Sequence, residues 1–315
     1  MKDTISIFGG SSNTVLVEEI CRILKVKKGN VSIGKFSDGE IEIKINENIR
    51  GNDVFVIQST CFPANDNLME LLILIDALKR ASAYRITAVL PYFGYARQDR
   101  KDQPRVPITA KLIANLLTRA GTSRVLTIDL HAGQIQGFFD IPLDHLYAIN
   151  VFADYFNSKN ITNLVVVSPD VGGIKMARAY SKILKGSLAI VDNRRINDEE
   201  AEVMNIMGEV KNKNVVIVDD IVATAGSLVE AAKALKKTGA KDIYATITHP
   251  VLCGPAVERI SASSIKELIV TNTIPIDKDK SMDKIKVLSI APLLASAIER
   301  IHNEESISIL FEQQS

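Results

Sequence analysis

Apolar, strand-like runs alternate with amphipathic helical stretches along almost the whole of this 315-residue chain. The expected strands lie at 54–58, 86–91, 125–129, 164–168, 187–191, 215–219, 243–248 and 268–271. The expected helices lie at 65–83, 109–120, 151–157, 173–184, 227–238 and 292–302. Such alternation is typical of parallel sheets with helices on both faces. The fold class is therefore expected to be α/β.

Length and composition are those of an ordinary globular protein with room for two domains, since 46% of the residues are apolar and 24% are charged. A net charge of +1 gives no electrostatic argument for binding nucleic acid or an anionic membrane. The chain enters a strand-like Ile5–Phe8 without the basic and apolar regions of a signal peptide. Its three cysteines are scattered without metal-ligand spacing, which predicts a reduced, cytoplasmic protein.

The segment 214–227 combines a strand, two carboxylates and the start of a helix. Val215 to Val218 form an unbroken β-branched run, which indicates a strand buried on both faces. The small residues Thr224 to Ser227 would then open the next helix. A turn of this kind presents unpaired N–H groups at the positive end of a helix, and these suit a phosphate.

Asp219 and Asp220 stand between this strand and the turn. Carboxylates would repel a phosphate, so they suit the hydroxyl groups of a sugar that carries one. An ordinary strand–helix connection with a capped helix is the alternative, because Asp and Thr are good N-caps. The acidic pair favours a sugar-phosphate site. The run resembles the loop shared by phosphoribosyltransferases and ribose-phosphate pyrophosphokinases, and by itself it does not distinguish them.

A second candidate segment, Pro91–Lys101, follows an expected strand and places aromatic rings beside three cations. Loops after strands are where ligands bind in open α/β sheets. Arg97 and Lys101 could neutralise a polyphosphate, and Gln98 offers an amide suited to the edge of a nucleobase. A solvated charged turn is the alternative, and the motif favours the ligand-binding interpretation.

His131 and Asp170 each follow an expected strand, so both are expected on the ligand face of the fold. An imidazole and a carboxylate could there hold Mg²⁺, which keeps several waters and takes phosphate oxygens. A separate stretch around Asp38-Gly39 indicates a hairpin turn, in which Phe36 is either a core residue or a base-stacking ring.

The two halves of the chain have features of a repeat. The expected strands at 125–129 and 215–219 both end in an acid, and the first is followed by Leu130-His131-Ala132-Gly133, a shorter and poorer phosphate cradle than 224–227. One duplicated fold would explain this similarity, and an even division of the strands places the boundary near residues 145–150.

Several long motifs, taken in order, resemble the ribose-phosphate pyrophosphokinase (PRPP synthetase) family. They are FSDGEIEIKINENIRG, PYFGYARQDRK, PITAKLIANLL, DLHAGQIQGFFDIPLDHL, SPDVGG and EVMNIMG. The resemblance runs from FGGSSN near the start to THPVLCGPA around His249. It implies two tandem phosphoribosyltransferase-like domains, each a mainly parallel sheet flanked by helices. The first, 1–148, would carry the ATP and metal elements, and the second, 149–315, the ribose 5-phosphate loop.

The resemblance also implies the reaction: the pyrophosphoryl group of Mg-ATP passes to the 1-hydroxyl of ribose 5-phosphate, giving PRPP and AMP. The implied ATP-binding residues are Phe36, Asp38, Gly39 and Glu40, reaching in from a neighbouring subunit, with Arg97, Gln98 and Asp102 in the subunit's own site. The implied Mg²⁺ ligands are His131 and Asp170. The implied ribose 5-phosphate-binding residues are Asp219, Asp220, Ala223, Thr224, Ala225, Gly226 and Ser227. Hexamers, activation by phosphate and inhibition by ADP are implied as well.

Two positions depart from the family pattern. Asn193 stands where a mobile loop of the family usually carries Lys, which leaves Arg194 and Arg195 as the candidate catalytic cations. Ala223 stands where a third Asp is usual. Losing one contact to developing charge typically costs about 10²–10³ in rate. The leading interpretation is a working pyrophosphokinase, with reduced activity as a possible consequence of the departures.

Two other interpretations stay open at this point. One is a weakly active or inactive family member that serves as a regulatory subunit of an active paralogue. The other is a phosphoribosyltransferase that consumes PRPP, although such an enzyme would not need the ARQDRK and FSDGE nucleotide elements.

Overall fold

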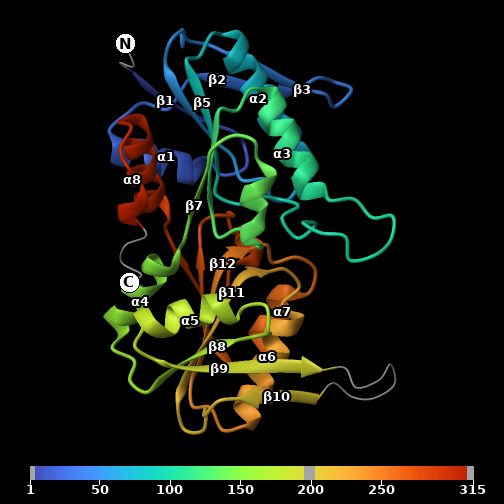
Figure 1. The fold of residues 1–315 in the computed structure, drawn as a ribbon, viewed down its shortest axis with the longest axis vertical. Coiled ribbons are helices and arrows are strands. Elements are labelled where there is room, and N and C mark those ends of the chain that lie inside the picture. Colours follow the sequence, from blue (N-terminus) through green and yellow to red (C-terminus); the bar gives the residue numbers. More distant parts are fainter. Residues whose placement is uncertain (1–3, 195–202, 311–315) are drawn as a thin grey trace. The chain divides into compact units, whose positions relative to one another are not determined.

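The computed structural model describes residues 4–194 and 203–310, which form two compact units (Figure 1). Of the described residues, unit 1 comprises 4–147, Thr273–Pro275 and 290–310, and unit 2 comprises 148–194, 203–272 and Ile276–Ser289. Each unit is built on one mainly parallel sheet with flanking helices, so the predicted α/β class is confirmed.

The sheet of unit 1 has five parallel strands in the order β1-β4-β5-β6-β7. Their bounds are Ile5–Gly9, Asp53–Ile57, Arg85–Leu90, Arg124–Ile128 and Leu143–Leu146. All five residues of β4 are buried, as expected for a strand with helices over both of its faces.

Four helices cover this sheet. Helices α2 (Ala64–Arg80) and α3 (Thr109–Ala120) share a hydrophobic core with Val54 and Val56 of β4. Helices α1 (Thr14–Leu24) and α8 (Ala291–His302) pack together on the other side (Figure 1). Unit 1 also contains an antiparallel hairpin, β2 (Val31–Lys35) and β3 (Ile41–Ile45), and two short 3₁₀ helices, η1 (Gly133–Phe138) and η3 (Ser308–Leu310).

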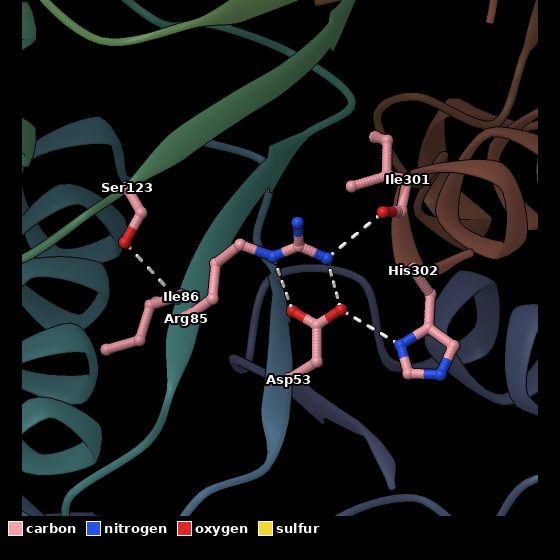
Figure 2. A network of polar contacts seen from close by, with 6 residues as sticks. All are labelled: Asp53, Arg85, Ile86, Ser123, Ile301 and His302. Carbon is pink, nitrogen blue, oxygen red and sulfur yellow. Dashed lines mark hydrogen bonds and ion pairs between the residues drawn. The ribbon is translucent and has the colours of Figure 1, made fainter. Parts of the chain in front are cut away.

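A polar network fastens the end of α8 to the sheet of unit 1 (Figure 2). Arg85 Nε donates to the buried carboxylate of Asp53 at 2.8 Å, and Arg85 Nη2 donates to the carbonyl of Ile301 at 3.0 Å. His302 Nδ1 lies 2.9 Å from Asp53 Oδ2. The hydrogen bonds to Asp53 raise the pKa of Arg85. The C-terminal part of the expected domain 149–315 therefore packs in unit 1, because α8 is bound to strands β4 and β5.

The sheet of unit 2 has seven strands in the order β10-β9-β8-β11-β12-β13-β14. In chain order from β8, their bounds are Leu164–Ser168, Ser187–Arg194, Val203–Met207, Asn214–Val222, Ile243–Pro250, Ile265–Thr271 and Ile285–Leu288. Neighbouring strands are parallel except β9 and β10, which form an antiparallel pair at one edge.

Helices lie on both faces of this sheet too. Helices α6 (Gly226–Lys237) and α7 (Ala256–Ala262) share a core with Val215 and Ile217 of β11. Helices α4 (Ile149–Lys159) and α5 (Ile174–Ile183) meet through Phe152 and Tyr180, and Phe156 of α4 stacks edge-on against Tyr244 of β12. A 3₁₀ turn, η2, covers Lys278–Lys280. The β-branched run of β11 is buried on both faces, as predicted.

Every strand and helix expected from the sequence is present, with ends that differ by a few residues. The elements that were not expected are α1, α7 and the short strands β7, β10 and β14. The proposed equivalence of the strands at 125–129 and 215–219 does not match the sheet orders. The parallel series β8-β11-β12-β13-β14 of unit 2 has the same order as β1-β4-β5-β6-β7 of unit 1, so β11 corresponds to β4 and not to β6. By position, the counterpart of the loop after β11 is therefore the loop after β4.

Candidate active-site elements

Strand β11 continues to Val222, beyond the end expected at Asp219, so Asp219 and Asp220 both lie inside the strand. The residues of β11 beyond Asp219 pair with β12, through Ile221–His249 and Val222–Pro250. Pairing of β11 with β8 ends earlier, at Ile217–Val167. The carboxylates therefore lie where the sheet opens next to the end of β8.

Asp170 follows the end of β8 and approaches the same place. Its charge, together with burial and the charge of Asp220, disfavours ionisation of Asp219. Burial is the largest cause, Asp220 comes next, and together they raise the pKa of Asp219 to about 8. Asp219 Oδ1 accepts the N–H of Asp220 at 2.9 Å. In these surroundings the ionised form of Asp219 would be stabilised by a cation or by hydroxyl donors.

The turn that carries Asp170 is held by its own polar groups. Ser168 Oγ donates to the carbonyl of Asp170 at 2.7 Å, and Asp170 Oδ1 accepts the N–H of Gly173 at 2.8 Å. Asp170 is exposed, and α5 begins directly after this turn. The carboxylate is thus fixed in direction while one side remains open to solvent or ligand.

Ala223 to Ala225 connect β11 to α6, which begins at Gly226, one residue before the expected helix 227–238. Ala225 has φ 59°, a left-handed conformation that costs a non-glycine residue about 1–2 kcal/mol. Such strain tends to occur at ligand sites. Among the described residues, none caps the N-terminus of α6 with its side chain. The interpretation as an ordinary capped helix is therefore not supported, and the first N–H groups of α6 remain available to an anion.

The residues expected around ribose 5-phosphate are close together in this one loop of unit 2. Asp220 and Ala225 are buried, whereas Thr224 and Ser227 are exposed at the surface of the loop. The hydroxyls and backbone N–H groups thus lie on the solvent side of a firmly packed base.

Phe36, Asp38, Gly39 and Glu40 form the turn of the β2–β3 hairpin, as the hairpin prediction required. Phe36 donates its N–H to the carbonyl of Glu40 at 2.8 Å, and Glu40 donates its N–H to Asp38 Oδ1 at 3.1 Å. Gly39 has φ 93°, which only glycine adopts easily. Phe36 is 51% exposed and is not a core residue.

Arg97, Gln98 and Asp102 lie in the long loop between β5 and α3, and all three are exposed. Gln98 Oε1 accepts the hydroxyl of Thr109 at 2.5 Å, and its carbonyl accepts the N–H of Ala110 at 3.1 Å. The amide of Gln98 is thereby tied to the first turn of α3.

The start of α2 links this loop to the hairpin. Lys35, at the end of β2, forms an ion pair with Asp66 at 2.6 Å. The neighbouring Asn65 accepts a hydrogen bond from the hydroxyl of Tyr95 in the loop. The two sets of expected ATP-binding residues are therefore both anchored to one helix turn of unit 1.

Thr60 is a residue of this region that sequence reasoning missed. Its N–H and its Oγ1 both donate to the carbonyl of Tyr92, at 3.0 and 3.1 Å, and Oγ1 accepts the N–H of Gly94 at 2.6 Å. A Cβ at Gly94 would lie 2.3 Å from the carbonyl oxygen of Thr60, so only glycine fits there. Nothing in the sequence marks Thr60, because its partners lie more than thirty residues away.

His131 is exposed and follows β6, between the left-handed Asp129 (φ 39°) and η1. His145, also missed, accepts the N–H of Leu130 through Nε2 at 2.8 Å and so fixes the turn in front of His131. His131 belongs to unit 1 and Asp170 to unit 2, so their role as shared Mg²⁺ ligands stays a prediction.

No three His, Cys, Asp or Glu side chains within residues 4–194 and 203–310 are grouped as a ready-made metal site. A cation at Asp170 would take most of its ligands from water and substrate, as Mg²⁺ commonly does. Of the residues expected to act in catalysis, Arg195 lies outside the described residues, and only the backbone of Arg194 is described, at the end of β9 opposite Val203.

Comparison with known proteins gives the family. Residues 5–121 match the N-terminal domain of ribose phosphate pyrophosphokinase, and residues 194–312 match the phosphoribosyl synthetase-associated domain. The chain is 56% identical to a ribose-phosphate pyrophosphokinase of Bacillus caldolyticus over 98% of both chains. It is 55% identical to that of Campylobacter jejuni over 97% of this chain and 98% of the relative.

The crystal structure of phosphoribosylpyrophosphate synthetase from Mycobacterium smegmatis matches 96% of this chain and 100% of its own, with 40% identity and a TM-score of 0.91. Similarity of this extent covers both sheets and the loops that follow their strands. The predicted tandem phosphoribosyltransferase-like fold is thus confirmed, and the chain belongs to the ribose-phosphate pyrophosphokinase family.

Proposed function

We propose that this chain is a ribose-phosphate pyrophosphokinase that transfers the pyrophosphoryl group of Mg-ATP to the 1-hydroxyl of ribose 5-phosphate, forming PRPP and AMP. The observation that carries this proposal is identity of 53–56% to pyrophosphokinases over nearly the whole chain. The uncapped, strained turn before α6 supports it, because its geometry suits a sugar phosphate.

In this proposal unit 2 binds ribose 5-phosphate. Thr224 to Ser227 hold the 5-phosphate through backbone N–H groups and hydroxyls, and Asp219 and Asp220 accept the ribose hydroxyls. Hydroxyl donors of the sugar favour the ionised form of Asp219, which burial and the charge of Asp220 disfavour in the ligand-free protein. Ala223 supplies backbone only, so the sugar has one acceptor fewer than the family pattern provides.

Unit 1 binds ATP. Arg97 binds the phosphates, Gln98 binds the base, and Asp102 is a third ATP-binding residue of the same loop. Phe36, Asp38, Gly39 and Glu40 serve the adenine of a neighbouring subunit. Little covalent chemistry is required of the protein, because holding the two reactants in line and neutralising phosphate charge account for most of the catalysis.

The residues present fit Mg²⁺. Asp170 is exposed, oriented by its own turn and close to two further acids, which suits a cation that keeps most of its waters. We propose Asp170 and His131 as its protein ligands. When bound, the ion neutralises the phosphate oxygens of ATP.

Arg194 and Arg195 are proposed as the cations that meet charge developing on the transferred group, since Asn193 has no charge to offer. The alternative of an inactive regulatory subunit gains no support, because the close relatives are named as pyrophosphokinases. We further propose a cytoplasmic homohexamer that phosphate activates and ADP inhibits. None of the described helices is long and apolar enough to span a bilayer.

The direct test is AMP formation from ATP by the purified chain alone, with Mg²⁺, in the presence and absence of ribose 5-phosphate. We expect AMP and PRPP in equal amounts and only when the sugar is present. AMP without PRPP would indicate hydrolysis, and no AMP at any enzyme concentration would refute the proposed activity.

Two variants separate the substrates in the same assay. Asp220→Ala should raise the KM for ribose 5-phosphate, and Arg97→Ala should raise the KM for ATP. Each increase should be roughly 5- to 150-fold, which corresponds to about 1–3 kcal/mol. An Arg97→Ala enzyme with an unchanged KM for ATP would show that the loop after β5 is only a solvated turn.

A further inference from the structure

Three consecutive carbonyl groups in the loop before α6 point toward one segment of unit 2, residues 252–259. The carbonyl of Val222 accepts the N–H of Leu252 at 3.1 Å, and that of Ala223 accepts the N–H of Cys253 at 3.0 Å. The third carbonyl, that of Thr224, accepts a hydrogen bond from Arg259 Nη1 at 3.0 Å.

The direction of these carbonyls fixes the direction of the N–H groups that follow them. In a planar trans peptide the C=O of one residue and the N–H of the next point in opposite directions. The N–H groups of Ala223, Thr224 and Ala225 must therefore point away from the 252–259 segment. Successive N–H groups turned to one side form a concave anion site of the kind that binds phosphate.

Only the last of the three bonds comes from a side chain. It acts on the peptide between Thr224 and the left-handed Ala225, which is the strained step of the loop. A Cβ at Gly226 would lie 3.4 Å from Arg259 Nη1, so the guanidinium also lies against the first residue of α6.

Helix α7 holds Arg259 in place for this task. The neighbouring Ala256 and Ile260 of α7 are fully buried in the core of unit 2, which α7 shares with α6 and β11. The N–H of Arg259 donates to the carbonyl of Pro255 at 3.0 Å. The base of the side chain is thus rigid, whereas its guanidinium is at the surface beside the loop.

We propose that Arg259 is a positioning residue for the sugar-phosphate loop: by bonding the carbonyl of Thr224, it turns the N–H of Ala225 toward the 5-phosphate of ribose 5-phosphate. This inference rests on the proposed function for the identity of the ligand, and on the loop geometry alone for the action of Arg259. Binding of the sugar phosphate then depends partly on Arg259, which contacts the loop and not the ligand.

The first test needs no activity. Hydrogen exchange of the amides of Leu252 and Cys253, which donate to the carbonyls of Val222 and Ala223 in this loop, is measured in the ligand-free full chain for wild type, Arg259→Met and Arg259→Lys. Arg259→Met removes the donor and keeps most of the length, and we expect it to speed exchange of these amides by roughly 10- to 100-fold, the scale of one charged hydrogen bond. Arg259→Lys should restore most of the protection. Lys266→Met, which removes another cation of unit 2, should leave these amides unchanged.

The second test is kinetic. Arg259→Met should raise the KM for ribose 5-phosphate by a similar factor, about 10- to 100-fold, and leave the KM for ATP unchanged. If Arg259 instead contacted the phosphate directly as a charge, the amides would keep their protection in Arg259→Met and the KM effect would shrink in high salt.

Unchanged exchange at Leu252 and Cys253 in Arg259→Met would overturn the positioning role, whatever the kinetics show. Faster exchange throughout unit 2 would also overturn it, because Arg259 would then support the whole fold. Loss of AMP formation in the wild type would refute the proposed function and leave the exchange result standing.

Discussion

Replacing Asp219 by Asn should make the ligand-free protein more stable at neutral and alkaline pH. Asn is nearly the same size, and its Oδ1 can still accept the N–H of Asp220, so the main change is loss of one ionisable group. In the folded protein, burial of the carboxyl group and the charge of Asp220 together raise the pKa of Asp219 from 3.8 to about 8.

The sign and size follow from proton linkage. Between pH 4 and pH 8 the folded state keeps a proton on Asp219 that the unfolded chain has lost, so raising the pH favours unfolding. Relative to Asp219→Asn, the wild type should lose about 1.4 kcal/mol of unfolding free energy per pH unit inside this window. From pH 5 to pH 7 the difference should grow by roughly 3 kcal/mol, which corresponds to about 10 °C in Tm for a unit of this size.

The measurement is the Tm of both proteins from pH 5 to pH 9, with a chelator and without phosphate or sugar phosphate. The gain in Tm should increase up to about pH 8 and then become constant. Asp242→Asn is the matched control. The hydrogen bond from Lys266 lowers the pKa of Asp242, so this variant should gain nothing and lose slightly above pH 4.

A Tm difference between wild type and Asp219→Asn that stays the same from pH 5 to pH 8 would refute the reasoning. It would mean that Asp219 is ionised in the folded, ligand-free protein at neutral pH. Adding Mg²⁺ and ribose 5-phosphate to the wild type should narrow the difference, because these ligands favour the ionised carboxylate.

Four other substitutions have definite expected outcomes. Arg85→Met should lower the unfolding free energy by about 3 kcal/mol in urea denaturation, because it leaves the buried carboxylate of Asp53 with one partner fewer. Thr60→Val should raise the KM for ATP by roughly tenfold at an unchanged KM for ribose 5-phosphate, because it unpairs a buried N–H at the base of the β5–α3 loop. Asn193→Lys should raise kcat by about 10²-fold with little change in either KM, whereas Ala223→Asp should lower the KM for ribose 5-phosphate.

Thr60→Val has a matched control variant, and three of these predictions have a result that would contradict them. Thr271→Val removes a similar buried hydroxyl bond in unit 2, from Thr271 Oγ1 to the carbonyl of Thr248 at 2.7 Å, and should not change the KM for ATP. Equal effects of Thr60→Val and Thr271→Val would show a general loss of stability. A kcat indifferent to Asn193→Lys would show that the remaining arginines suffice. A urea midpoint unchanged in Arg85→Met would show that α8 is held by packing alone.

The sequence predicts those elements whose pattern is local. The β-branched run of β11 and the amphipathic pattern of α3 lie where they were expected. Strands β7 and β14 have four residues each and lie at sheet edges, so neither carries a long enough pattern to be recognised. The missed helix α1 did carry a signal, because Asn13 caps it and buried residues recur at helical spacing.

The site is predictable in part for the same reason. The acids and small residues of β11 and its turn are contiguous, so their chemistry can be read from the sequence. Thr60, His145 and Arg259 act on loops that are 15 to 35 residues away in the chain, and only tertiary structure brings them there. The end of β11 was also misplaced, because pairing with β12 extends the strand through Asp219 and Asp220.

The network of Asp53, Arg85 and His302 has a consequence for biosynthesis. Strands β4 and β5 leave the ribosome early, but the helix that satisfies Asp53 and Arg85 is among the last parts of the chain to be made. Domains usually fold as they emerge, N-terminal first. Here the first domain to be translated must wait, with one face of its sheet covered by α1 but not by α8, until unit 2 has been synthesised. A nascent or truncated chain that lacks α8 therefore exposes apolar surface of α1 and of the sheet to chaperones and proteases.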